Sequence, residues 1–453
     1  MSLPHFHATP LRRLPLAALL SLAFAGASQA QSLVDIYEMA KGYDATYQSA
    51  KAQYDANLAK ADQGKAQLLP QVGLSAGATR SQRDVTPTTA PSTTNYNYTT
   101  QTAGINATQP LYRPANLATY RQSQKSLELA QAALNQAEQD LVVRVSQAYF
   151  DVLSAQDSLA FVQAQKAAVA EQLASAKRNF EVGTATITDT REAQARFDLV
   201  TAQEIAADND LRVKTVALEL LVGKAGLKPV RLQSGVNLPA VDGQGVDSWI
   251  AQSEQNHPTI RQARVNLDVA KLETEKAVAG HKPTVDLTLG YNSQKNINGT
   301  SIQLTGVTNQ INVASAGITF NLPLYAGTAT QNRIRETTAL EEKARMDLEG
   351  AQRQVTQATR TAYLGLQSGL GQVKAYEAAE ASSQVALDAN KLGYQVGVRI
   401  NIDVLNSQSQ LYQTKRDLAK ARYDVLVGQL KLRQAAGVLK AEDLQPINAL
   451  LAP

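Results

Sequence analysis

Two stretches of the chain, 214 residues apart, carry the same pattern. One reads "KRNFEVGTATITDTREAQ" (Lys177–Gln194) and the other reads "NKLGYQVGVRINIDVLNSQ" (Asn390–Gln408). Both contain an aromatic residue, a Val-Gly pair and an Asp at matching positions. Self-similarity at a long, fixed period indicates that the chain holds two copies of one structural unit.

The repeat extends far beyond these two stretches. "LLPQVGLSAG" (Leu68–Gly77) matches "HKPTVDLTLG" (His281–Gly290), and "QPLY" (Gln109–Tyr112) matches "LPLY" (Leu322–Tyr325), both at an offset of 213. The offset changes by one residue over the whole unit, so the two copies have nearly the same length. We predict these segments: a first repeat at 31–223, a linker at 224–245 in the middle of the shaft, a second repeat at 246–437 and a C-terminal tail at 438–453.

The first 30 residues have the pattern of a secretory signal peptide. Arg12 and Arg13 precede an apolar run, Leu14–Phe24, and a small-residue cleavage site that ends at Ala30. The run is too short to span a bilayer, and no other stretch approaches the ~20 apolar residues that a membrane helix needs. We therefore expect an exported protein without a membrane helix.

Composition excludes several functions. The chain has no Cys, which excludes disulfides, thiolate metal sites and a lipid-anchored N-terminus. Removing the signal peptide removes two Arg and leaves 42 Lys and Arg against 40 Asp and Glu, a formal charge of +2. This balance argues against nucleic acid as a partner. No cofactor is predicted.

Four short strands are predicted, two in each repeat, at about 68–80, 98–111, 283–292 and 310–324. Val72 and Leu74 begin an alternation of apolar and small residues, which is typical of a half-buried strand. In the fourth strand Ile311 and Ile318 differ in parity, so we expect a β-bulge at 314–317. Soluble hairpins and outer-membrane strands both fit this pattern. In a membrane, four strands could not close a barrel, so several chains would have to share it.

Long helices are predicted to form the rest of each repeat. Helices at 115–178 and 328–392 contain no Pro, and at 1.5 Å per residue each would be ~95 to 98 Å long. The predicted helices at 32–67 and 190–222 are about half as long, so these two helices stacked end to end would match one long helix. The predicted helix at 403–436 has a similar length. In the last helix Leu411, Leu418 and Leu432 lie in one heptad register. Such spacing predicts coiled-coil packing.

These features together resemble the TolC family of outer-membrane efflux and secretion ducts. The resemblance rests on "GYQVGVRINIDVLNSQSQLYQTKRDLAKARYDVLVGQLKLRQAAG" (Gly393–Gly437), "LLPQVGLS" and both "P-L-Y" strand ends, and it covers the whole mature chain. It implies an α+β membrane protein with an internal two-fold repeat. Three chains would form a 12-stranded β-barrel in the outer membrane of a Gram-negative bacterium, continued by a periplasmic coiled-coil barrel. The absence of Cys distinguishes the chain from lipidated relatives.

The resemblance also assigns the quoted stretches to the periplasmic tip. It implies a latch in which Tyr394 and Arg399 hold the coiled coil closed through Thr188 and Asp189. The alternative for both Asp residues is helix capping, with Asp189 spaced as a capping box to Glu192. A packing role for Tyr394 and a solvated surface position for Arg399 are the corresponding alternatives.

Two further groups of residues are assigned by the resemblance. Asp403 would form a pore constriction ring of three carboxylates, with Asn406 at the position where many members carry a second acidic ring. The residues expected to contact a periplasmic adaptor protein are Val182, Gly183, Thr184, Val396, Gly397 and Val398. For Gly183 and Gly397 the alternative role is to form the turn between two helices.

The resemblance implies a passive exit duct for efflux or type I secretion, with an inner-membrane pump or ABC transporter as a further partner. An enzyme is disfavoured, because the mature chain has two His residues, His257 and His281, and no nucleophile motif or metal-ligand cluster. His257 precedes Pro258 at a helix start and is interpreted as structural. A trimeric coiled-coil surface adhesin is the alternative function, although it would not need a duplicated pair of strands.

Overall fold

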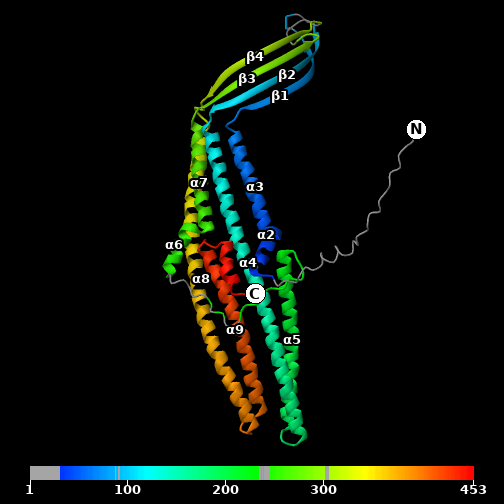
Figure 1. Ribbon diagram of the computed structural model, residues 1–453. Helices are drawn as coiled ribbons and strands as arrows, with labels where there is room; N and C mark the ends of the chain where they lie inside the picture. The colour runs from blue at the N-terminus through cyan, green and yellow to red at the C-terminus, as the bar shows by residue number, and fades with distance from the viewer. Residues whose placement is uncertain are drawn as a thin grey trace, which may run out of the picture.

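The computed structural model describes residues 31–86, 88, 89, 92–233, 236, 238, 245–300 and 306–452. The expected signal peptide and part of the expected linker lie outside these residues. The described chain is strongly elongated, with a curved sheet at one end, a shaft of helices and two helical hairpins at the other end (Figure 1). One hairpin consists of α4 (Pro114–Glu181) and α5 (Ile187–Val222), and the other consists of α8 (Ala329–Gln395) and α9 (Asn401–Ala435). We call the ends of these hairpins the two tips.

The first repeat has the order helix, two strands, long helix, helix. Its elements are α2 (Leu33–Tyr43), α3 (Ala45–Ala66), β1 (Gln71–Val85), β2 (Thr94–Tyr112), α4 (Pro114–Glu181) and α5 (Ile187–Val222).

The second repeat has the same order. Its elements are α6 (Val246–Asn256), α7 (Pro258–Val278), the 3-10 turn η1 (Ala279–His281), β3 (Thr284–Ile297), β4 (Asn309–Asn321), α8 (Ala329–Gln395) and α9 (Asn401–Ala435). The tail adds η2 (Ala441–Asp443) and α10 (Leu444–Asn448). Figure 1 shows the C-terminus near the middle of the shaft.

Local sequence signals explain where the helices of the first repeat begin and end. Pro114 occupies the first turn of α4, where its missing N–H costs nothing. The Asp44 carboxylate accepts a hydrogen bond from Tyr47 N at 2.8 Å and so caps α3. Arg144 donates to both Asp44 oxygens at 2.9 and 3.0 Å. Burial raises the pKa of Asp44, but these hydrogen bonds outweigh it and hold the pKa below its usual value.

The four strands form one antiparallel sheet in the order β1-β2-β3-β4, and the β2–β3 pairing joins the two repeats. The bulge expected at 314–317 is wrong, because β3 and β4 pair without interruption from Thr284↔Asn321 to Asn296↔Asn309. The irregularity lies instead between Pro110 and Tyr112 in β2. Proline has no N–H to give to the ladder, so regular pairing cannot continue through it.

Three of the strands, β1, β2 and β3, are longer than apolar alternation alone indicated, whereas β4 ends at Asn321, before the end expected at 324. β1 extends to Val85 and β3 to Ile297, past the ends expected at 80 and 292. Backbone hydrogen bonds between strands form equally well between polar residues, so strand pairing extends beyond the segment with alternating apolar residues.

The register places large apolar side chains of all four strands on one face of the sheet, which we call the apolar face. Leu74 pairs with Ile105, which pairs with Tyr291, and Leu287 pairs with Ile318. The opposite face carries small and polar residues: Ser75, Gly77, Thr102, Gly104, Thr288, Gly290, Ser315 and Gly317. The parity change in β4 therefore places Ile311 and Val313 on the opposite face, next to Gln294 and Asn292.

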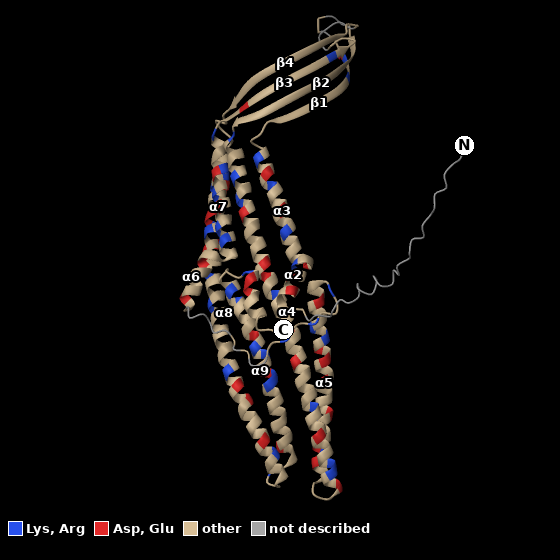
Figure 2. Ribbon diagram, viewed as in Figure 1, with Lys and Arg blue, Asp and Glu red and all other residues tan. Residues whose placement is uncertain are grey.

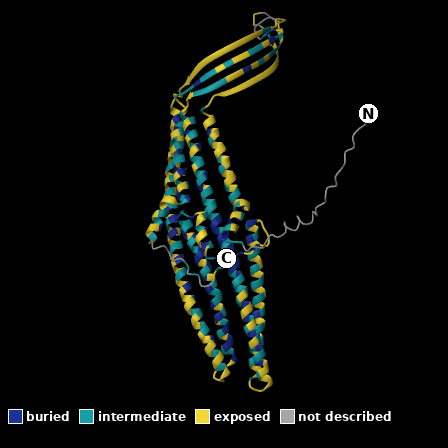
Figure 3. Ribbon diagram, in the orientation of Figure 1, coloured by how far each residue is buried: buried dark blue, intermediate teal, exposed yellow. Residues whose placement is uncertain are grey.

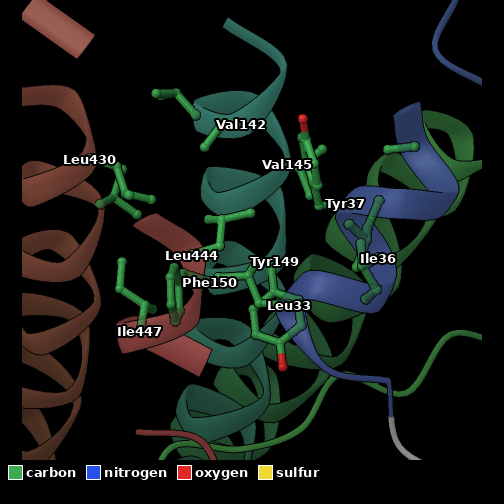
Figure 4. Packing of buried hydrophobic residues seen from close by; sticks show 14 of the residues in the cluster. Leu33, Ile36, Tyr37, Val142, Val145, Tyr149, Phe150, Leu430, Leu444 and Ile447 are labelled. Atoms are coloured by element: carbon green, nitrogen blue, oxygen red, sulfur yellow. The ribbon is translucent and has the colours of Figure 1, made fainter. Parts of the chain in front are cut away.

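A buried cluster in the middle of the shaft holds the two repeats together (Figure 4). Tyr149 and Phe150 of α4 lie edge to face at 5.5 Å between ring centroids, and Phe150 stacks on Tyr423 of α9 at 5.6 Å. Tyr149 Oη donates to Val230 O at 2.8 Å, which fastens the start of the linker to the cluster. Aromatic contacts of this kind contribute about 0.5 to 1.5 kcal/mol beyond area burial.

An ion pair between an exposed arginine and a buried aspartate joins the sheet to the shaft. Arg113, at the junction of β2 and α4, donates through Nε and Nη2 to the two carboxylate oxygens of Asp286 in β3, at 2.7 and 2.6 Å. A bidentate pair fixes orientation as well as distance. It therefore couples the first repeat to the second where the strands meet the helices.

Much of the molecule's apolar surface is not covered by its own chain (Figure 3). On the sheet, Leu74 is 82% exposed and Phe320 is 63% exposed. Along the shaft, Val216, Leu220, Leu364 and Val385 are also exposed. None of the described helices combines the length and the apolar character needed to cross a membrane.

Candidate functional site

The two tips have the same backbone geometry. Gly183 and Gly397 both adopt φ +78°, the left-handed conformation that favours glycine, which confirms their expected role in the turn. An equivalent backbone bond closes the helix in each tip: Thr184 N donates to Asn179 O at 2.8 Å and Val398 N donates to Gly393 O at 2.9 Å. These bonds satisfy carbonyls that the helix end leaves free.

The tips differ in how the return helix is capped. Thr186 is the N-cap of α5 and forms a capping box with Asp189, whose carboxylate accepts from Thr186 N at 2.9 Å and from Thr186 Oγ1 at 2.8 Å. The expected box from Asp189 to Glu192 is therefore wrong, because the helix starts three residues earlier. Ile400 occupies the N-cap of α9 and has no side-chain oxygen. Asp403 consequently lies in the first turn without a capping partner.

The Asp403 carboxylate is instead close to Arg399. Arg399 Nη1 and Asp403 Oδ2 are 3.7 Å apart, and the two side chains are 60% and 34% exposed. Gly393 makes room for this arrangement, because a Cβ there would lie 2.7 Å from Arg399 Cγ. The solvated pair is weak, worth less than about 1 kcal/mol. Both charges are thus available to other partners.

Four hydrogen bonds cross between the tips, and none was predicted from the sequence. Asn179 Nδ2 donates to Tyr394 Oη at 3.3 Å, Gln172 Nε2 to Asn401 Oδ1 at 2.5 Å, and Asn401 Nδ2 to the Asp189 carbonyl at 3.4 Å.

The fourth bond runs from Arg196 Nη2 to Asn406 Oδ1, over 2.8 Å. Asn401 is fully buried although it begins a helix at an otherwise exposed tip, a position that only the structure reveals.

A cleft of about 670 Å³ lies between the tips. Of the predicted site residues, it is lined by Thr184, Asp189, Tyr394, Gly397 and Arg399. Thr188, Asp403 and Asn406 lie outside the lining. The structure thus brings three of the four predicted latch residues to one cleft, where the neutral bonds of Asn179 and Asn401 connect the hairpins.

The outermost tip surface is apolar. Val182, Val396 and Val398 are 72%, 66% and 77% exposed, beside the two turn glycines. Exposed valines that cluster at a solvent-facing tip are available to a partner protein.

The two His residues lie far from the tips in sequence. His257 Nδ1 accepts from Thr259 N at 3.2 Å and so caps α7, which confirms its structural interpretation, and burial lowers its pKa. Within the described part of the chain, no group of three or more His, Cys, Asp or Glu side chains could hold a metal ion.

Comparison with known proteins gives consistent matches over nearly the whole chain. A family model described as outer membrane efflux protein matches twice, over residues 36–224 and 249–438. Outer membrane protein TolC of Vibrio cholerae is 34% identical over 420 residues, which make up 93% of this chain and 94% of that protein. Alkaline protease secretion protein AprF of Pseudomonas aeruginosa is 32% identical over 432 residues, covering 93% and 87%.

Solved structures show the same fold. The crystal structure of the outer membrane protein VceC from Vibrio cholerae has a TM-score of 0.73 at 20% identity, covering 89% of this chain and 96% of that one.

Proposed function

This chain belongs to the outer membrane efflux protein family, and on that premise we propose that three copies of it form one passive exit duct from the periplasm to the exterior. The resemblance seen in the sequence is confirmed, as are the fold with its two-fold repeat and the identity of the protein as an outer-membrane efflux or type I secretion channel. The protein is not an enzyme, and the family match decides against an adhesin.

The sheet is the observation that carries the proposal. Its apolar face is exposed on all four strands, and its edge strands β1 and β4 have no outer neighbour within the described chain. Lipid cannot satisfy unpaired backbone groups, so the sheet has to be closed by other copies. Three copies would bring twelve strands, with small and polar residues facing the lumen.

The shaft supports the same assembly. α4 has 68 residues and α8 has 67, which at 1.5 Å per residue gives ~100 Å each. Exposed apolar residues on α5 and α8 would be covered by neighbouring copies, as coiled-coil seams require.

We propose that the latch acts at the cleft between the tips. Arg399 has a weak partner in its own helix, so it can exchange Asp403 for Thr188 and Asp189 of a neighbouring hairpin. Tyr394 would contribute a phenolic hydrogen bond. A guanidinium that faces a carboxylate and a hydroxyl can make several charge-assisted hydrogen bonds. A few such bonds hold the entrance shut and still allow it to open.

Asp403 forms the constriction ring, with one carboxylate from each chain. Support for this comes from the N-cap Ile400, which leaves the carboxylate uncapped, in contrast to its counterpart Asp189. Asn406 at the second-ring position adds no charge, so the ring is a single one.

The partners act at the tips. The exposed Val-Gly turns at 182–184 and 396–398 receive a periplasmic adaptor protein, which links the duct to an inner-membrane pump or ABC transporter. The sheet faces outer-membrane lipid.

Planar-bilayer recording tests the proposed duct. Purified protein should produce discrete ion conductance, and Val396→Asp combined with Val398→Asp should abolish crosslinking to the adaptor without changing that conductance. Protein that inserts as a stable oligomer but never conducts would contradict the proposal. Undiminished crosslinking would refute the assigned tip surface alone.

A further inference from the structure

Two cations stand on the apolar face of the sheet, close to its outer end. The register places Lys295 of β3 level with Ala78 of β1, and Arg80 of β1 level with Ile297 of β3, all four on the face that carries Leu74 and Tyr291. Figure 2 shows basic residues at the end of the sheet away from the helices. Arg80 and Lys295 are separated by the width of β2.

Both cations are exposed and unpaired. Among the described residues neither has an ion-pair partner, and both side chains are in the exposed class. The nearest acid on that face of β1 is Asp84, four residues beyond Arg80 and about 13 Å further along the strand. The positive charge is therefore not neutralised within the part of the chain that the structure describes.

Their height on the sheet is defined by the apolar residues below them. Val285 and Phe320 form the lowest paired row of the apolar face, and Lys295 lies ten residues above Val285. Ten residues of antiparallel strand span ~34 Å, which at a tilt of about 40° gives ~26 Å along the membrane normal. Outer-membrane barrels carry an apolar band about 25 Å tall, so Lys295 marks its outer boundary.

Below this outer boundary, the apolar face carries an aromatic residue and a row of small uncharged residues, as expected near a membrane surface. Tyr291, half exposed, is four residues below Lys295 on the same face, as in the aromatic girdle at a membrane surface. The interval between them is filled by Ala76, Ala103 and Ser293. Along the apolar face, from the helix end of the sheet to its outer end, the side chains are first apolar, then aromatic, then small and finally cationic.

We propose that Arg80 and Lys295 form a binding site for the phosphate groups of the outer-leaflet glycolipid, the phosphorylated glucosamine headgroup of lipopolysaccharide. This inference rests on the proposed placement of the sheet in the outer membrane. Two cations about 12 Å apart match a headgroup with two phosphates better than a phospholipid with one. Arg offers a bidentate fork and Lys a point charge, both of which suit phosphate.

The test is native mass spectrometry of the intact, detergent-solubilised protein titrated with bisphosphorylated lipid A. Each cation near an anionic lipid surface changes binding about fivefold, so Arg80→Gln with Lys295→Gln should weaken binding about 25-fold. The matched control is Lys282→Gln, which removes an equally exposed lysine at the opposite end of β3. It should bind as the unaltered protein does.

Two outcomes would overturn the site. Weakening of about fivefold by Lys282→Gln, the share of one charge, would show that only total charge matters. Unchanged binding by the double variant would show that these residues do not bind the lipid. Phosphatidylglycerol is the competing probe, and displacement of lipid A by an equal concentration of it would reject the glycolipid as the occupant. Oligomer mass and conductance are recorded for each variant, so failure of the duct is distinguished from failure of this site.

Discussion

Asp403→Asn is the perturbation that best separates a pore ring from a helix cap. The structure shows Asp403 without a capping bond and with one solvated partner, Arg399, at 3.7 Å. An exposed pair of this kind contributes less than about 1 kcal/mol. The substitution should therefore leave the thermal stability of the oligomer nearly unchanged.

Its effect on a blocking cation should be much larger. A trivalent cation 4 Å from one carboxylate in bulk water gains ~3 kcal/mol, and salt screening removes much of this. With about a third of this attraction left after screening, each carboxylate contributes ~1 kcal/mol and a ring of three contributes ~3 kcal/mol to binding of the cation. The block from the periplasmic side should then weaken on the order of a hundredfold in Asp403→Asn.

Asn406→Asp should tighten the block, but by less than this. Arg196 already donates to Asn406 at 2.8 Å and would neutralise part of the added charge. Adding Arg196→Gln to that variant should remove this neutralisation and tighten the cation block further.

The assay is single-channel recording with the trivalent cation added to the periplasmic side. Asp388→Asn is the matched control, because it removes an exposed acid of α8 near the tip, whose carboxylate accepts hydrogen bonds from Gln384 of the same helix. A block that survives Asp403→Asn, or that falls equally in the control, would refute the ring.

Three further predictions follow from the described contacts. Arg399→Glu removes the charge-assisted bonds of the latch and adds a repulsive charge, so single-channel conductance should rise; unchanged conductance in a correctly assembled variant would assign Arg399 to the surface. Ile400→Thr supplies the missing cap hydroxyl, which should stabilise the oligomer by about 0.5 to 2 kcal/mol and weaken the cation block, because Asp403 would then be held as Asp189 is. Arg144→Ala leaves the buried Asp44 carboxylate without its guanidinium partner. It should lower the free energy of unfolding by about 2 to 3 kcal/mol at neutral pH, as measured by thermal unfolding. Because the folded pKa of Asp44 is depressed, that loss should shrink as pH falls below about 4.

The long elements and the repeat were predictable because they depend on local sequence. Long runs without an internal proline define α4 and α8, and the Val-Gly pairs define the turns through a backbone preference that needs no partner. Pro110 also carried a local signal for the one bulge in the sheet, but the change of parity in β4 drew attention away from it.

The contacts between the tips could not be predicted in the same way. Asn179 meets Tyr394, and Arg196 meets Asn406, only because two hairpins separated by more than 200 residues are brought together by the sheet and the mid-shaft cluster. The contrast between Thr186 and Ile400 was visible in the aligned repeats. Its consequence for Asp403 depends on where each helix starts, which the structure defines.

The central claim is that this chain completes its membrane sheet with two further copies. The measurement that tests it most directly is the protein mass of the particle in mild detergent, determined by light scattering. The account predicts a single species of three chains and no stable monomer. A monodisperse monomer with its secondary structure intact would contradict it.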